Sequence, residues 1–238
     1  MKRYIAIVAL SAVVAHAGCK PAHPSKIVAD PSFEPNRITA ILIAPFVSSV
    51  PRGEDPDRQS ERIMNRTLAG LLAERSDYRF LSQDQFQAAV ARAGLGDHWA
   101  SFSQDWMSRR TVDKEFLAQL KVALNVDVLM LPHVFLWNKD EADYRESATS
   151  SATQVGATLA LFETTTGTIL WEASDQNYRE SVRSESRGVI SGGGIDRRVA
   201  GVSGTGRDAY AAPPYEEVAQ IVLEALVGAL PPRSGSAR

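Results

Sequence analysis

The only thiol in the chain belongs to Cys19, which directly follows a short hydrophobic leader. The leader has a basic start, Lys2-Arg3, then an apolar run over residues 4–15, and the small pair Ala17-Gly18 precedes the cysteine. This layout is typical of a secretory signal peptide, and the apolar run is too short to span a bilayer. A lone thiol in an exported protein needs an explanation, because the compartment outside the cytoplasm oxidises thiols. The chemistry to expect at Cys19 is therefore modification of its sulfur.

The segment Ala17-Gly18-Cys19 resembles a bacterial lipobox, in which the cysteine takes a diacylglycerol and becomes the new N-terminus. The resemblance implies removal of residues 1–18 and lipid attachment at Cys19, and two or more acyl chains hold a protein stably on a membrane. His16 departs from the pattern, which prefers leucine there. Lys20, in place of aspartate, implies the outer membrane of a Gram-negative cell, facing the periplasm. The alternative is ordinary signal cleavage that leaves a free thiol.

Proline-rich, polar sequence follows the cysteine and predicts a flexible tether over residues 19–36. Such a tether reaches at most about 55–60 Å, which would keep the folded part near its membrane. We expect a single periplasmic α/β domain over residues 37–230 and a disordered tail over residues 231–238.

The residues that could act as ligands or bases are scattered after the leader. His23 lies in the expected tether, His98 stands alone, and His133 lies within an apolar segment, which favours a structural histidine. The carboxylates of residues 140–143 belong to a charged turn. Neither zinc-ligand spacing nor a nucleophile elbow nor a phosphate-binding loop occurs. We therefore expect no enzymatic activity, no cofactor and no metal, and a net charge of −2 gives no reason to expect nucleic acid.

Apolar periodicity predicts alternating strands and helices. The resulting order is β-α-β-α-α-β-β-β-α, which predicts an α/β (α+β sandwich) fold with a mixed sheet of about five strands covered by about four helices. The strands are expected over residues 37–46, 78–81, 126–137, 154–163 and 168–178, and the helices over residues 57–74, 82–94, 111–124 and 213–230. Pro132 requires a bulge or a position that needs no N–H from it.

One candidate partner surface is a helical stripe between Leu95 and Arg110. Aromatic side chains recur at helical spacing there and two arginines follow, so the stripe could dock on a partner or lie at a bilayer surface. An ordinary core helix is the alternative. The candidate residues are Trp99, Phe102, Trp106, Arg109 and Arg110.

A second candidate is the glycine-rich stretch over residues 187–207. It is a candidate flexible binding loop, an anion-binding nest or a segment that orders on assembly, and plain disorder is the alternative. Its candidate residues are Gly192, Gly193, Gly194, Arg197 and Arg198.

Three segments carry a family resemblance: residues 38–46 (ITAILIAPF), 125–134 (NVDVLMLPHV) and 159–173 (LALFETTTGTILWEA). They resemble the lipoprotein group that includes the curli secretion lipoprotein, and periplasmic activators of penicillin-binding proteins and the N-terminal domain of TolB are similar in fold. The resemblance covers roughly residues 37–181 and 213–230 and implies a fold of that group. Residues 187–207 lack the alternating apolar strands of a membrane pore.

The resemblance implies a non-enzymatic scaffold or accessory factor for a cell-envelope complex, in peptidoglycan synthesis or in secretion and transport. Its expected partners are the membrane, through the N-terminal lipid, and an envelope protein or further copies of the same chain. Two alternatives stay open: an oligomeric secretion-channel component, and a periplasmic lipoprotein that binds a small ligand.

Overall fold

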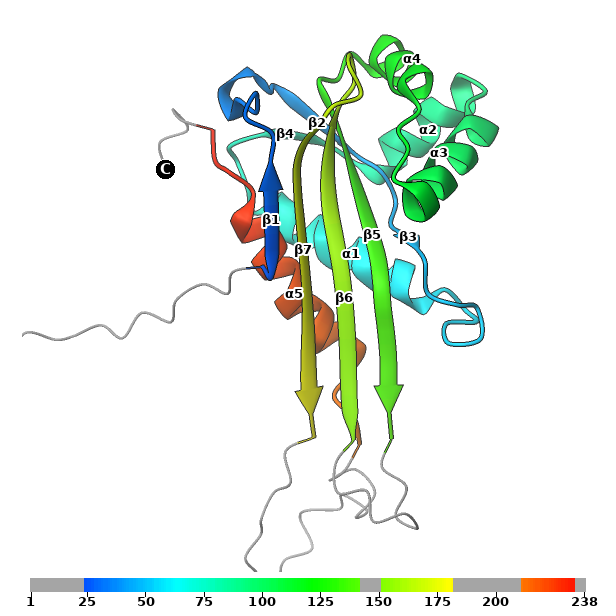
Figure 1. Ribbon diagram of the computed structural model, residues 1–238, viewed down its shortest axis with the longest axis vertical. Coiled ribbons are helices and arrows are strands. Elements are labelled where there is room, and N and C mark those ends of the chain that lie inside the picture. Colours follow the sequence, from blue (N-terminus) through cyan, green and yellow to red (C-terminus); the bar gives the residue numbers. More distant parts are fainter. Residues whose placement is uncertain (1–23, 142–150, 182–210, 234–238) are drawn as a thin grey trace, which may run out of the picture.

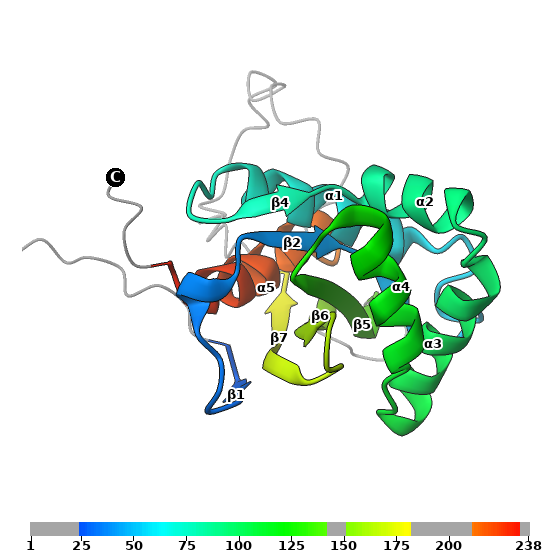
Figure 2. The same ribbon diagram turned by 90° about the horizontal axis from the view of Figure 1, so that it is seen from above.

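A computed structural model describes residues 24–141, 151–181 and 211–233. They form an α+β fold with a mixed sheet and helices on both of its faces (Figures 1 and 2), which confirms the expected fold class. The elements in chain order are β1 (Lys26–Ala29), a 3₁₀ turn (Pro35–Arg37), β2 (Ala40–Ile43), β3 (Val47–Ser48), α1 (Gln59–Ala73), β4 (Arg79–Leu81), α2 (Gln83–Arg92), α3 (Gly96–Arg109), α4 (Lys114–Leu124), β5 (Val128–Asp140), β6 (Ala152–Glu163), β7 (Ile169–Glu180) and α5 (Tyr215–Ala229).

The described residues form a seven-stranded sheet, in which six strands follow the order β1-β7-β6-β5-β2-β4 and the seventh, β3, pairs with β5. Parallel pairing joins β2 to β4 and β5, and β3 to β5, whereas β5, β6, β7 and β1 are antiparallel. The counts differ from the expected five strands and four helices, because β1, β3 and α3 add to them.

The strand β1 corrects the expected extent of the tether. Residues Lys26–Ala29 lie within the segment assigned to a flexible tether, yet they pair with β7 from Lys26↔Ser174 to Ala29↔Trp171. Ser25 also donates its backbone N–H to the Asp175 carboxylate at 3.0 Å. The folded part therefore begins about ten residues earlier than the sequence predicts.

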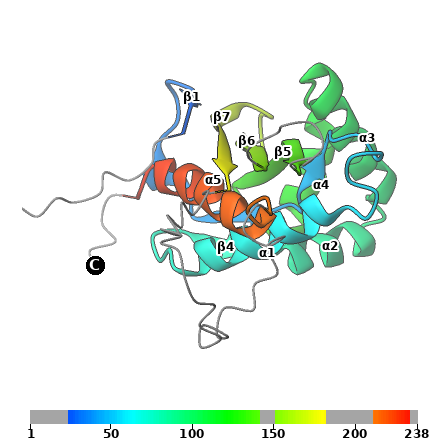
Figure 3. The same ribbon diagram turned by 90° about the horizontal axis from the view of Figure 1, so that it is seen from below.

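Two helical layers cover the sheet on opposite faces. Helices α1 and α5 lie along one face, called here the back face, and α2, α3 and α4 gather over one end of the other, the front face (Figures 1 and 3). Each layer has its own apolar core. Strand residues alternate between the two cores, as the period of two requires: Met130 and Leu161 belong to the back core, and Leu129 and Phe162 to the front core.

The strands β2 and β3 form one interrupted line beside β5. Pairing with β5 stops at Ile43↔Met130 and resumes at Val47↔His133, and Pro45 lies in the interruption. Pro132 lies opposite this gap, where neither β2 nor β3 pairs with it. The bulge of β5 comes later, between Val134 and Leu136.

Local signals in the sequence fix several element ends. Ser82 and Gln85 form the expected capping box at the start of α2. The expected β6–β7 hairpin turns at Gly167, whose φ of 74° lies in the left-handed region that glycine adopts without strain. Among the described residues, no helix is long and apolar enough to cross a membrane.

Candidate functional site

A row of polar side chains crosses the front face of the sheet just beyond the α2–α4 layer. His133, Thr158, Ser174 and Lys26 are successive cross-strand neighbours from β5 to β1, and we call them the polar row. The Thr158 and Ser174 hydroxyls share a hydrogen bond of 2.8 Å. His133 and Thr158 are buried, whereas Lys26 at the sheet edge is exposed. The row therefore runs from the protein interior to solvent.

His133 is the buried end of the polar row. Its Nε2 lies 2.9 Å from the Ser49 hydroxyl, and its Nδ1 is buried without a hydrogen-bond partner among the described residues. Burial, reinforced by the positive charge of Arg110, lowers the pKa of His133 to about 4. The imidazole is therefore neutral at pH 7.

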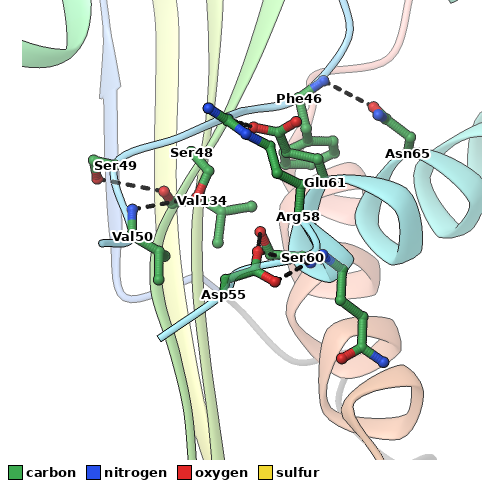
Figure 4. A network of polar contacts seen from close by, with 11 residues as sticks. Phe46, Ser48, Ser49, Val50, Asp55, Arg58, Ser60, Glu61, Asn65 and Val134 are labelled. Atoms are coloured by element: carbon green, nitrogen blue, oxygen red, sulfur yellow. Dashed lines mark hydrogen bonds and ion pairs between the residues drawn. The ribbon is translucent and has the colours of Figure 1, made fainter. Parts of the chain in front are cut away.

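The loop after β3 holds Ser49 in place (Figure 4). The Ser49 backbone N–H donates to the Val134 carbonyl at 3.0 Å, which continues the β3–β5 pairing beyond Ser48. Further along the loop, Asp55 is buried and accepts hydrogen bonds from the backbone N–H groups of Gln59 and Ser60 at 2.7 and 3.1 Å. These bonds satisfy free donors at the start of α1.

Arg110 joins α3 to the polar row. It ends α3 with a left-handed φ of 57°, and its guanidinium lies over the Trp106 ring, 4.6 Å from the centroid. The same guanidinium lies 3.6 Å from the Glu172 carboxylate of β7. Since Glu172 is two residues before Ser174 on the same face, Arg110 brings a positive charge to the border of the polar row. The Arg109 guanidinium instead lies 3.5 Å from the Asp105 carboxylate on α3.

The aromatic stripe of α3 is part of the front core, which corrects its interpretation as a candidate partner surface. Phe102 and Trp106 are 0% and 1% exposed, and both meet the Phe162 ring edge-on. Trp99 is half-buried and packs edge-on against Phe86. The core alternative therefore describes the stripe, and of the five candidate residues only Arg109 and Arg110 are exposed.

The Ser49–His133 pair has the residue types of a nucleophile and a base. Such pairs usually need a third group that orients the imidazole. Among the described residues no side chain accepts a hydrogen bond from Nδ1, and a pKa of about 4 makes the imidazole a weak base. The pair joins the residue after β3 to β5. No group of three or more His, Cys, Asp or Glu within the described part of the chain could hold a metal ion.

Exposed aromatic side chains continue the front face beyond the polar row. Phe135 is the extra residue of the β5 bulge, and its ring lies against Gly156, where an added Cβ would meet it at 2.6 Å. Tyr178 of β7 follows, and the two side chains are 38% and 49% exposed. Helices α1 and α5 cover the back of these strands (Figure 1).

A hollow of about 690 Å³ lies between the ends of α1 and α5. One of the charged residues that line it, Arg75, is already engaged: it pairs with Asp77 and donates to the Val227 carbonyl at 2.6 Å and the Leu230 carbonyl at 3.0 Å. Arg75 therefore closes the C-terminus of α5 and is not free to recognise a small ligand.

Two of the sequence-predicted sites lie outside the described residues. They are the lipid-attachment site Cys19 and the glycine-rich loop with Gly192, Gly193, Gly194, Arg197 and Arg198. Sequence reasoning missed Ser49, because only the β3–β5 register brings it to His133, 84 residues away.

No family model matches the chain, and no curated protein matches it. Similar solved structures include the lipoprotein GNA1162 from Neisseria meningitidis, with 19% identity over 62% of this chain and 88% of that one, at a TM-score of 0.44. The hypothetical protein CT253 from Chlamydia trachomatis has 9% identity over 80% of this chain and 94% of that one, at a TM-score of 0.47. The PelC dodecamer from Paraburkholderia phytofirmans has 11% identity over 85% of this chain and 92% of that one, at a TM-score of 0.37. These likenesses concern the arrangement of helices and strands, and none assigns a function.

Proposed function

We propose that this chain is a lipoprotein of the bacterial cell envelope that works without catalysis as a scaffold or accessory factor for an envelope complex. A lipid on Cys19 anchors it in the outer membrane, and the α+β domain faces the periplasm. Its partner belongs to peptidoglycan synthesis or to a secretion or transport complex. The observation that carries the proposal is the leader that ends at Cys19.

The start of the sheet supports a membrane-proximal position. Strand β1 begins at Lys26, seven residues after Cys19, and seven residues span at most about 25 Å when fully extended. A domain held so closely would act on proteins beside its own membrane.

The exposed end of the front face supports contact with a protein. Phe135 and Tyr178 offer aromatic surface there, next to hydroxyl and amide groups of the same strands, and aromatic residues among polar ones are typical of protein interfaces. The proposed partner surface is therefore this end of β5–β7.

The anchor is tested by mass spectrometry of the mature N-terminus in a Gram-negative host. We expect a diacylglycerol-modified Cys19, and Cys19→Ser should release the protein from the membrane fraction. The matched variant His16→Leu, which restores the preferred lipobox residue, should be processed at least as completely. An unmodified thiol at residue 19 in the mature protein would refute the lipoprotein proposal.

The partner surface is tested by a photocrosslinking amino acid placed at Phe135 in living cells. The control position is Val122 on α4, which is 88% exposed. We expect a discrete crosslink to an envelope protein from residue 135 and not from residue 122. Equal crosslinking from both positions would exclude this surface.

A further inference from the structure

The strand β1 leaves one edge of the sheet open. Within the described residues it pairs with β7 alone, and all four of its residues are exposed. Two of them, Ile27 and Val28, are apolar and 48% and 53% exposed on opposite faces. An edge strand with unpaired backbone groups can accept another strand unless charge, proline or a cover prevents it.

The hydrogen-bond pattern shows which backbone groups point outward. Asp30 donates its N–H to the carbonyl of Leu170, the residue opposite it, at 2.9 Å, so this N–H faces β7. Antiparallel ladders alternate residue by residue, so Lys26 and Val28 also bond toward β7. The N–H and C=O groups of Ile27 and Ala29 therefore point away from the sheet.

The charges along β1 match a second, antiparallel copy of the same strand. Lys26, Val28 and Asp30 lie on one face of the strand, with a positive charge at one end and a negative charge at the other. Lys26 has no ion-pair partner among the described residues, and within the same residues the Asp30 carboxylate accepts hydrogen bonds only from Ser32. Those bonds from Ser32 lower the pKa of Asp30, which keeps its carboxylate ionised.

We propose that two copies of this chain associate through β1, antiparallel, with Val28 of each copy on the two-fold axis. In this register Ile27 and Ala29 of one copy exchange backbone hydrogen bonds with Ala29 and Ile27 of the other, and Lys26 lies opposite Asp30. A register centred on Ile27 also aligns the outward groups, but it places Lys26 opposite Val28 and loses the charge match. The pairing joins two sheets into one and goes beyond the proposed function, since it requires no lipid.

Cysteine crosslinking tests the register directly. The Lys26–Asp30 and Val28–Val28 positions are non-hydrogen-bonded pairs with Cα atoms about 4.5 Å apart, which suits a disulfide. Full-length Lys26→Cys and Asp30→Cys variants, each with its own epitope tag, are produced together and oxidised. The controls are the parent chain, which reports any crosslink through Cys19, each variant alone, and Lys26→Cys paired with Val122→Cys.

We expect the mixed Lys26→Cys and Asp30→Cys dimer to exceed every control several-fold, and Val28→Cys to crosslink with itself. Mixed dimer at or below the level of the controls would overturn the proposal. Charge reversal supplies an independent measurement: Lys26→Glu should reduce Val28→Cys crosslinking, because like charges then face each other. Lys26→Glu combined with Asp30→Lys should restore it, and failure to restore it would also overturn the register.

Discussion

The two faces of strands β5–β7 differ although the same strands build them. On the back face, apolar side chains continue from Trp171 through Leu159 to Trp137, and all of them are buried. On the front face, the apolar core ends at Leu131 of β5 and Ala160 of β6, and the polar row follows. The change coincides with the end of the α2–α4 layer, whereas α1 and α5 continue along the back (Figure 1).

This difference assigns the two faces different roles: the back face contributes to stability, and one end of the front face offers surface for contact. Helices close the back face, which contributes to the core, whereas the end of the front face that no helix of the described residues covers offers His133, Phe135 and Tyr178 at its surface or just beneath it. One sheet can therefore hold the fold together on one side and present a surface to other proteins on the other. Substitutions on the two faces should differ accordingly.

The largest difference in the free energy of unfolding is expected between substitutions of two nearby aromatic residues of β5, Trp137 and Phe135. Trp137 on the back face is 2% exposed and stacks on Tyr215 of α5 with centroids 4.1 Å apart. Trp137→Ala should lower the free energy of unfolding by about 3–5 kcal/mol, because it leaves a cavity in the core. Phe135→Ala on the front face should cost about 1 kcal/mol or less.

Urea unfolding of both variants with a common probe measures this comparison. Equal losses would show that the uncovered front face contributes to the core as much as the back face does. Trp106 of α3 is also buried, so Trp106→Ala should lower the melting temperature.

The buried end of the polar row should make stability depend on pH. The pKa of His133 is about 4 in the folded protein and about 6.5 in the unfolded chain. Since the folded value is depressed, the contribution is present above pH 6.5 and is lost as the pH falls toward 4, where the unfolded chain binds the proton first. At pH 4.5 the loss should be about 2–3 kcal/mol relative to pH 7.

His133→Gln is the matched variant, since it keeps a polar group near Ser49 without titrating. Urea unfolding at pH 7 and 4.5 should show a smaller loss for the variant than for the parent. Identical pH dependence in the two proteins would mean that His133 is not buried in the neutral form.

The close contact between the Gly156 backbone and the Phe135 ring on the front face should have a smaller effect on the free energy of unfolding. A Cβ at Gly156 would lie 2.6 Å from the Phe135 ring and 3.0 Å from the Leu136 Cβ, so Gly156→Ala should cost about 1–2 kcal/mol by crowding. Phe135→Ala in the same chain should recover much of this loss, because the ring is the nearer obstacle.

Gly228→Ala in α5 is the control for the glycine itself. Apart from the backbone of the helix itself, no atom lies within 4 Å of the position that a Cβ would take at Gly228, and alanine favours a helix by up to about 1 kcal/mol. Gly228→Ala should therefore stabilise the protein in thermal unfolding. If Gly156→Ala were equally harmless, Phe135 would not rest on β6.

Local patterns were enough to predict the main elements of this fold. Alternation over residues 154–163 and 168–178 predicted β6 and β7, and Gly167 marked their turn. The strand β1 was missed because four residues among prolines carry little pattern, and its pairing with Ser174 and its neighbours is distant in sequence. The two-residue β3 was missed for the same reason.

The candidate site was predictable only in part. The apolar surroundings of His133 indicated burial, and its position in β5 agrees with that. Its partner Ser49 depends on strand register, which no short motif encodes. The aromatic spacing of α3 fits a buried face and an exposed one equally well, and only the position of α3 against Phe162 distinguishes them. Lipid attachment at Cys19 stays a prediction.

The smallest effect, a shift in the pKa of His133, is expected from substitution of Arg110, which lies where α3 meets the sheet on the front face. Arg110 lies between Trp106 and Glu172, and its charge is the second cause, after burial, of the low pKa of His133. Arg110→Gln should therefore raise the pKa of His133 above about 4, but not to an ordinary value, because burial remains. Titration of the imidazole by NMR measures the shift, and Arg110→Lys, which keeps the charge, should change it less. An unchanged pKa in Arg110→Gln would mean that α3 does not act on the polar row, and that burial by the sheet alone distinguishes its front face from its back.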